Sequence, residues 1–254
     1  AASIPMLADL LLDISSARLY EEVLKLFMAG EGLAGYELLR HYGLFGRLFP
    51  ETETALAEEV DGHPQILISR ALENTDKRVV EDKPVTPAFL FAALLWPPVL
   101  RRWRATAEDM GELAALQAAG NWIVNVQASH TAIPKRFSLP MREIWSLQPR
   151  FEQRSGRRPL RLASHPRFRA AYDFLLLRGE AGEVDAELCQ WWTEFQERSG
   201  EAREVMMAAP EKKAKKRRRR RRSGAARASG DGAPGEGVAQ DASPASTDAG
   251  GDGG

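Results

Sequence analysis

The chain has 254 residues, of which 44% are hydrophobic, and its 35 basic residues are balanced by 35 acidic ones. This length and apolar content are those of a globular protein and exclude collagen-like, disulfide-rich and wholly disordered classes. The zero net charge is a cancellation, because residues 1–134 carry −7, residues 135–178 carry +8, residues 179–210 carry −6 and residues 211–254 carry +5. Such an asymmetry indicates a polyanionic partner for the two basic blocks.

We expect neither a secretory signal nor a transmembrane segment in this sequence. The first apolar stretch, residues 4–14, is interrupted by Asp9 and Asp13 and lacks a basic start. The longest apolar run, residues 85–100, is shorter than the roughly 20 residues that span a bilayer, so we expect a buried helix and no transmembrane segment. Cys189 is the only cysteine, which favours a reducing, cytoplasmic compartment. The chain opens in mid-pattern without Met, which indicates a piece of a longer protein.

Helical periodicity marks the first half of the chain. The spacing of apolar residues predicts a helix over residues 18–28 and another over residues 33–42, which Gly43 ends with a left-handed cap. A third predicted helix ends near Asn74. Pro87, a residue that the first turn of a helix tolerates, opens a buried apolar helix. All four segments are helical in period.

The second half repeats this pattern. Residues 141–145 place their apolar side chains on one face of a helix, which Pro149 must kink or end. A further helix is opened by Pro166, and the last has its apolar residues at helical spacing over 184–195. No stretch shows a period of two bounded by hairpin turns. The sequence therefore predicts an all-α fold of seven to nine helices.

The composition changes near the C-terminus. Ten of the eleven residues from Lys212 to Arg222 are basic, and the remainder is rich in Gly, Ala, Ser and Asp. Such a segment cannot bury enough apolar surface to offset the entropy of ordering it, so we expect residues 206–254 to be a disordered tail. Its basic run would hold phosphates without sequence specificity, although anionic lipid or a processing enzyme are alternative partners.

No catalytic signature is evident. The four histidines, at positions 41, 63, 130 and 165, are scattered and lie in no metal-binding frame. The nearest paired carboxylates are Glu51 with Glu53 and the acidic group over 183–187, and neither follows a strand that could present two metal ions. Acidic residues at these positions suit the first turns of helices. We therefore predict no catalytic residue, no metal site and no cofactor within this chain.

Arginine dominates residues 135–178, with aromatic residues interleaved. A planar guanidinium suits phosphates and stacks on bases, which favours nucleic-acid binding, and Trp145 is a candidate for base stacking. The alternative is a solvated basic face that balances the acidic flanks. The predicted nucleic-acid-binding residues are Lys135, Arg136, Arg142, Trp145, Arg150, Arg154, Arg157, Arg158, Arg161, Arg167 and Arg169, and in the tail Lys212, Lys213, Lys215, Lys216, Arg217, Arg218, Arg219, Arg220, Arg221 and Arg222.

Several strings resemble the neck, body and C-terminal part of bacterial poly(A) polymerases. They include ARLYEEVLKL (17–26), NTDKR (74–78) and HPRFRAAYDFL (165–175). Further matching strings are residues 38–45, 48–50, 87–96, 133–136, 142–148 and 191–196, so that the resemblance covers roughly residues 5–222. Pro149 departs from the family, which usually continues a helix at that point.

The resemblance implies a class II nucleotidyltransferase, a polynucleotide adenylyltransferase that adds adenylates from ATP, with magnesium, to RNA 3′ ends and so marks transcripts for decay. The implied partners are single-stranded RNA 3′ ends, an upstream catalytic head domain and RNA-decay proteins. The matching strings do not include that head, so the resemblance implies a chain that is inactive alone.

The resemblance also implies an organisation of the chain. It implies a helical neck over residues 1–60 and a helical body over residues 61–134, packed in series. A basic RNA-binding region over residues 135–205 and the tail then follow. In the neck, Arg18 would pair with Glu21 and Glu22 at i+3 and i+4 and brace the nucleotide pocket of the head.

Two alternatives remain open at this point. The chain could be a non-catalytic RNA-binding adaptor, or it could be the C-terminal part of a CCA-adding tRNA nucleotidyltransferase, which shares the neck architecture.

Overall fold

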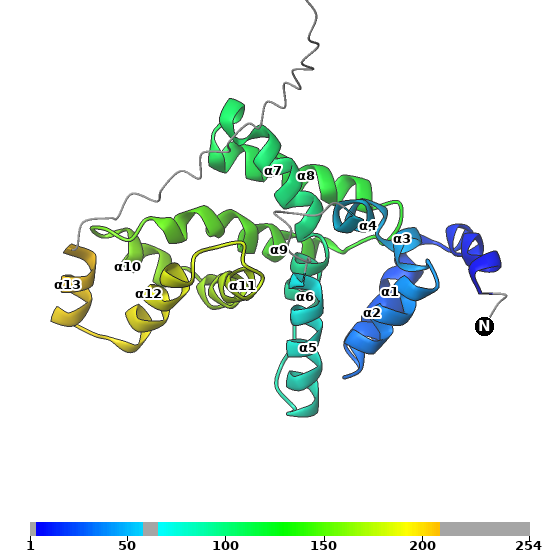
Figure 1. Ribbon diagram of the computed structural model, residues 1–254, viewed down its shortest axis with the longest axis horizontal. Coiled ribbons are helices and arrows are strands. Elements are labelled where there is room, and N and C mark those ends of the chain that lie inside the picture. The colour runs from blue at the N-terminus through cyan, green and yellow to red at the C-terminus, as the bar shows by residue number, and fades with distance from the viewer. Residues whose placement is uncertain (1–3, 58–65, 209–254) are drawn as a thin grey trace, which may run out of the picture. The chain divides into compact units, whose positions relative to one another are not determined.

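The computed structural model describes residues 4–57 and 66–208, and these residues are helical with no strand among them (Figure 1). In chain order the elements are η1 (Pro5–Asp13), α1 (Ser16–Phe27), α2 (Gly32–His41), α3 (Phe45–Leu48), α4 (Pro50–Ala57), α5 (Leu67–Val80), α6 (Pro87–Leu94), α7 (Trp96–Met110), α8 (Glu112–Gln127), α9 (Lys135–Leu147), η2 (Gln148–Glu152), α10 (Arg158–Ala163), α11 (Phe168–Glu180), α12 (Ala186–Glu197) and α13 (Glu201–Ala208). The predicted all-α class is confirmed. Within the same residues, no helix is both long and apolar enough to cross a bilayer.

The predicted number of helices was too low. The described residues form thirteen α-helices and two 3-10 helices, because α3, α10 and α13 are too short to display a full apolar period. The apolar run over 85–100 forms two helices, since the chain bends at Leu95 and the second helix starts with Pro97 in its first turn. The helix predicted to end near Asn74 continues to Val80.

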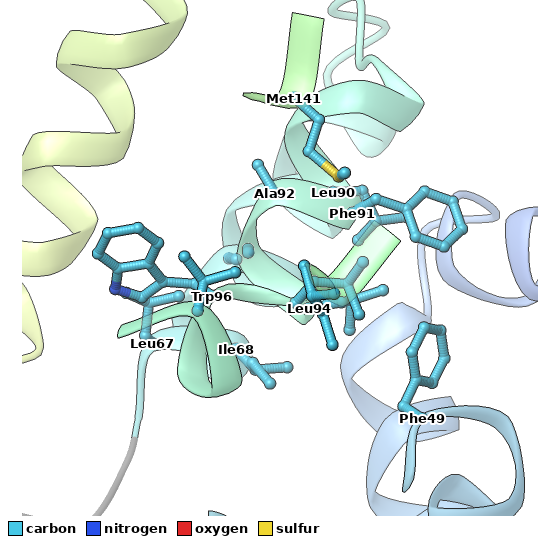
Figure 2. Close-up of a cluster of buried hydrophobic side chains, with 14 of the residues drawn as sticks. Phe49, Leu67, Ile68, Leu90, Phe91, Ala92, Leu94, Trp96 and Met141 are labelled. Atoms are coloured by element: carbon cyan, nitrogen blue, oxygen red, sulfur yellow. The ribbon is translucent and has the colours of Figure 1, made fainter. Parts of the chain in front are cut away.

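A first hydrophobic core surrounds α6. Residues 90–94 are each at most 2% exposed, as expected for a helix that is apolar on every side. Figure 2 shows Leu90, Phe91, Ala92 and Leu94 together with Phe49, which follows α3, Ile68 from α5 and Met141 from α9. Helices α1, α8 and α11 also contribute buried side chains. A helix whose sequence has almost no amphipathic period therefore lies at the centre of this core.

A second core is formed by Leu147 at the end of α9 and by η2, α10, α11, α12 and α13. Pro149 ends α9 as predicted, and the 3-10 turn that follows carries Phe151 into this core, where it is fully buried. The indole of Trp192 packs edge-on against Phe151 and donates its Nε1 hydrogen to the Phe151 carbonyl at 2.8 Å. The proline that interrupts the helix therefore also places an aromatic anchor.

The two cores meet along α11. Its Phe174 and Leu177 belong to the first core, and Phe168, Tyr172 and Leu175 belong to the second. Because α11 buries both faces, its amphipathic period is weak in the sequence.

Arg178 lies buried where the two cores meet. Its guanidinium stands 4.9 Å from the Trp96 ring and donates to Glu183 Oε2 at 3.0 Å and to Gln148 Oε1 at 3.1 Å. Burial lowers the pKa of Arg178, and the Glu183 carboxylate opposes that shift. Arg178 belongs to the basic block by sequence, but its side chain is an internal structural group.

The first core draws on all three predicted segments, 1–60, 61–134 and 135–205. The described residues, 4–57 and 66–208, belong to one compact unit, so the division into neck, body and basic region stays a prediction. The folded part was predicted to end at residue 205, but α13 continues to Ala208 and Met206 packs into the second core. The rest of the predicted tail, residues 209–254, lies outside the described residues.

Candidate nucleic-acid interface

A cavity of about 530 Å³ opens between α5, the connection over residues 81–86 and α11. We call it the α5–α11 groove. The two helices are in contact, and Figure 1 shows them beside each other although almost ninety residues separate them in the chain. Cavities of roughly 300–1,000 Å³ are typical of small-ligand sites. The groove is therefore large enough to hold part of a bound polymer.

The α5 wall is built by helical spacing. Asn74, Lys77, Arg78 and Glu81 line the groove at i, i+3, i+4 and i+7. Thr75 also lines the groove but is only 5% exposed, and its hydroxyl donates to the Ala71 carbonyl at 2.8 Å. The helix thus presents a packed face to the core and a charged face to the groove.

The connection after α5 is held in place by Arg78. Its Nε and Nη2 donate to the Pro84 carbonyl at 3.2 Å and 2.9 Å. Asp82 adopts a left-handed conformation with φ 54°, which turns the chain back towards α6. Lys83 then lines the groove and pairs with Glu81 at 2.7 Å. Arg78 therefore shapes the groove as well as charging it.

The α11 wall carries Arg167, Arg169 and Asp173. Arg167 donates to Glu143 Oε2 at 3.0 Å, and Arg169 Nε lies 3.0 Å from Asp173 Oδ1 and 3.2 Å from Asp173 Oδ2. Burial raises the pKa of the Asp173 carboxyl above its ordinary value, and the Arg169 guanidinium opposes this shift.

The charged residues that line the groove have a net positive charge. The basic ones are Lys77, Arg78, Lys83, Arg167 and Arg169, and the acidic ones are Glu81, Asp173 and Glu180, which leaves two positive charges in excess.

Most of the predicted RNA-binding residues within the described part of the chain are exposed. These are Lys135, Arg136, Arg150, Arg157, Arg158, Arg161, Arg167 and Arg169. Two others are less free, since Arg142 donates to Asn121 Oδ1 at 2.7 Å and Arg154 pairs with Glu187 at 3.4 Å with only 17% of its side chain exposed. Lys212 to Arg222 lie outside the described residues.

Trp145 was expected to stack on bases, and the structure corrects this. The side chain is 1% exposed, and its Nε1 donates to the Ala92 carbonyl of α6 at 3.1 Å. Gly120 of α8 makes room for the ring, because a Cβ atom there would lie 3.2 Å from Trp145 Cε3. Trp145 is a core residue that joins α6, α8 and α9.

The predicted pairing of the neck residues takes a different form. Arg18, Glu21 and Glu22 are exposed on α1, as their spacing indicates. Glu22 pairs with Lys25 at 2.9 Å, and among the described residues no ion pair joins Arg18 to Glu21 or Glu22. A bracing role towards another domain stays a prediction.

The paired carboxylates have structural positions, as expected. Glu51 and Glu53 lie in the first turn of α4. Asp185 caps α12 by accepting from the Glu187 amide at 3.0 Å, and Glu183 is the partner of Arg178. Across residues 4–57 and 66–208, no group of three or more His, Cys, Asp or Glu side chains could hold a metal ion.

Lys77, Arg78 and Lys83 were not among the predicted binding residues. They lie within residues 1–134, whose net charge is −7, so a count of charges over that range gives no sign of a basic site. The string over residues 74–78 was the available signal, and only the packing of α5 on α11 places it opposite Arg167 and Arg169.

Comparisons with known proteins match two separate ranges of the chain. A family model described as "Polymerase A arginine-rich C-terminus" matches residues 108–224, and one described as "Probable RNA and SrmB- binding site of polymerase A" matches residues 1–56. The α11 wall and the exposed arginines lie within the first of these ranges.

Similar curated proteins carry one name, Poly(A) polymerase I. The protein from Escherichia coli O6:H1 is 45% identical over 201 residues, which are 77% of this chain and 43% of that protein. The Salmonella typhi protein is 42% identical over 213 residues, 82% of this chain and 45% of that protein. The Haemophilus influenzae protein is 40% identical over 204 residues, with 79% and 45% covered. The chain thus spans less than half the length of these relatives.

Proposed function

The chain belongs to the bacterial poly(A) polymerase family, and we propose that it holds single-stranded RNA while adenylates are added to the RNA 3′ end. The two family models that match it are described as an RNA-binding site and as an arginine-rich C-terminus. The observation that carries the proposal is the exposed basic surface of α9, α10 and α11 together with the net positive α5–α11 groove.

The arrangement suits single strands. Exposed guanidinium groups contact phosphates through charge-assisted hydrogen bonds, and such contacts follow a flexible backbone without reading its sequence. Arg157, Arg158 and Arg161 lie on and beside the short helix α10, so their side chains are close enough to contact successive phosphates. Tail residues Lys212 to Arg222 would add non-specific affinity.

The chemistry of adenylate transfer belongs to the full-length protein in this proposal. ATP and magnesium would bind in an upstream catalytic head domain, and α1, with Arg18, Glu21 and Glu22, would brace that head. The activity would take place in the cytoplasm. No residue of this chain is assigned a catalytic role.

Residues 1–56 also support a protein partner. The description of the family model for this range names SrmB as a partner of polymerase A. Leu7, Leu10 and Leu12 of η1 and Leu38 of α2 are each 57% exposed and offer apolar surface for a protein that acts in RNA decay.

RNA binding is tested by fluorescence anisotropy with labelled A12 at several salt concentrations between about 50 mM and about 200 mM. The double variant Arg157→Ala/Arg158→Ala should bind more weakly, and its log–log salt slope should be shallower by about 1.4, because each contact to a single-strand phosphate contributes about 0.7. The matched control Arg104→Ala/Arg198→Ala removes two exposed charges elsewhere and should keep the wild-type slope.

Two outcomes would overturn the proposal. The first is no binding of A12 by the wild-type chain at the lowest salt. The second is an equal loss of slope in the double variant and in its control. Incubation of the chain with labelled ATP, magnesium and A12 should give no incorporation.

A further inference from the structure

The α5–α11 groove has a chemistry beyond its positive charge. Its floor is apolar, with Met28, Leu90, Leu176 and Leu177 among the lining residues, and Phe89 is the single aromatic side chain among the described residues that line it. Phe89 is half-buried and is held edge-on by Phe174 at 6.1 Å between ring centroids. An aromatic ring that is fixed at the floor of a cavity offers a surface on which a flat base can stack.

The rim supplies charge on both sides of this floor. Lys77 and Arg78 stand on the α5 side, and Arg167 and Arg169 stand on the α11 side. The bonds from Arg78 to the Pro84 carbonyl hold its guanidinium in place, so less side-chain entropy is lost when an anion binds. A phosphate on either side of a base would therefore meet a cation.

Asp173 gives the groove a hydrogen-bond acceptor. Its carboxylate lies on the α11 wall, and 34% of its side chain is exposed. Arg169 Nε lies within hydrogen-bond distance of both carboxylate oxygens. A carboxylate has about four lone-pair sites, so acceptor positions are left over. An acceptor here favours a base that presents an amine and repels the O4 acceptor of uracil.

We propose, on the basis of the RNA-binding function above, that the groove takes one unstacked nucleotide of the bound RNA and that Asp173 selects a base with an exocyclic amine over uracil. The base lies on Phe89 and the apolar floor, and the flanking phosphates lie at Lys77 and Arg78 on one side and at Arg169 on the other. Binding of this kind takes a base out of the stack and reads its edge.

The sharpest test compares C12 with U12, because the two pyrimidines have rings of the same size and differ at position 4 in having an amine or a carbonyl. The wild-type chain should bind C12 roughly three- to tenfold more tightly than U12, as one hydrogen bond allows. In Asp173→Asn this ratio should fall towards one and the affinity for U12 should rise, because an amide can donate to O4. The control Asp109→Asn, on the exposed end of α7, should keep the wild-type ratio.

A second variant tests the stacking surface. Phe89→Leu keeps an apolar side chain over the core but removes the ring. It should lower the affinity for both C12 and U12 by roughly tenfold or less. The salt slope should stay unchanged, since no phosphate contact is lost. Lys77→Ala should have the opposite signature, a slope shallower by about 0.7 with the wild-type C12-to-U12 ratio. Arg104→Ala serves as the charge-matched control.

The results separate this proposal from the one on which it rests. If neither C12 nor U12 binds at low salt, RNA binding itself is wrong. If both bind with a steep salt dependence but with equal affinity, or if Asp173→Asn leaves their ratio unchanged, the chain binds RNA and the nucleotide site in the groove is wrong. Photo-cross-linking of an oligonucleotide labelled with 5-iodocytidine, which keeps the amine at position 4, to peptides that contain Phe89 or residues 167–173 would support the site. Cross-links confined to other helices would contradict it.

Discussion

Tyr20 shows how one buried polar atom affects this fold. Its ring is stacked on Phe91 with centroids 5.4 Å apart and on Phe137 with centroids 6.4 Å apart. Its hydroxyl is buried and has no hydrogen-bond partner among the described residues. Burial raises the pKa of Tyr20, and the nearby charge of Arg136 opposes that shift. The ring therefore contributes packing, while the hydroxyl costs desolvation free energy.

Replacement of Tyr20 should reveal this cost. We expect Tyr20→Phe to raise the free energy of unfolding by about 1 kcal/mol, because it removes an unpaired buried group and keeps the ring. Tyr172→Phe is the matched comparison, since the Tyr172 hydroxyl lies 2.7 Å from Thr193 Oγ1, and it should lower that free energy by about 1 kcal/mol. Urea denaturation measures both. A destabilised Tyr20→Phe would mean that the hydroxyl has a partner.

At the scale of the elements, one helix caps another. The first turn of α2 has no acidic residue, and its N-cap residue, Glu31, makes no capping bond with its side chain. Asp76 from α5 takes that role, with Oδ1 accepting from the Gly32 amide at 2.7 Å and Oδ2 from the Leu33 amide at 2.9 Å. The approach needs glycine, because a Cβ atom at Gly32 would lie 2.8 Å from the Phe27 carbonyl oxygen.

Asp76→Ala should therefore destabilise the fold through α2. We expect a loss of about 1–2 kcal/mol in the free energy of unfolding, as for other lost N-caps. Glu73→Ala, one turn earlier on the same helix, breaks only the exposed pair with Arg70 and should change that free energy by less than about 1 kcal/mol. Urea denaturation measures the free energy of unfolding of both variants, and equal losses would argue against a capping role for Asp76.

Over the whole molecule, the two hydrophobic cores share α11 and the buried group around Arg178. Trp96 Nε1 also donates to Glu183 Oε2 at 2.7 Å, so one carboxylate oxygen accepts from both Trp96 and Arg178. Gln148 completes the group by donating to the carbonyls of Ile144 and Ala171 at 3.0 Å each. Hydrogen bonds rather than apolar contacts alone thus fix how α7, α9, η2, α11 and the connection after α11 meet.

Removal of the arginine should cost more than the loss of a surface pair. We expect Arg178→Met to lower the free energy of unfolding by about 3 kcal/mol, because it leaves the Glu183 carboxylate largely buried without its counter-charge. The double variant Arg178→Met/Glu183→Gln should recover part of this loss, since a neutral amide can still accept from Trp96. Arg198→Met, which breaks the exposed pair with Glu194, should change the free energy of unfolding by less than about 1 kcal/mol. A double variant no more stable than the single one would contradict the explanation.

The sequence by itself determined the all-α class, the end of α9 at Pro149, the basic block and the family resemblance, because local periodicity, proline chemistry and motif strings depend on neighbouring residues. Periodicity could not show that Trp145 is buried in the core, nor that Arg178 is buried while Arg167 is exposed. The helices that cover Trp145 and Arg178 are distant from them in the chain. Only the tertiary structure brought Lys77 and Arg78 of an acidic segment opposite Arg169 and Asp173 of a basic one. The physical reason is that a groove between two helices is set by long-range packing, here the contact of α5 with α11, which no local pattern records.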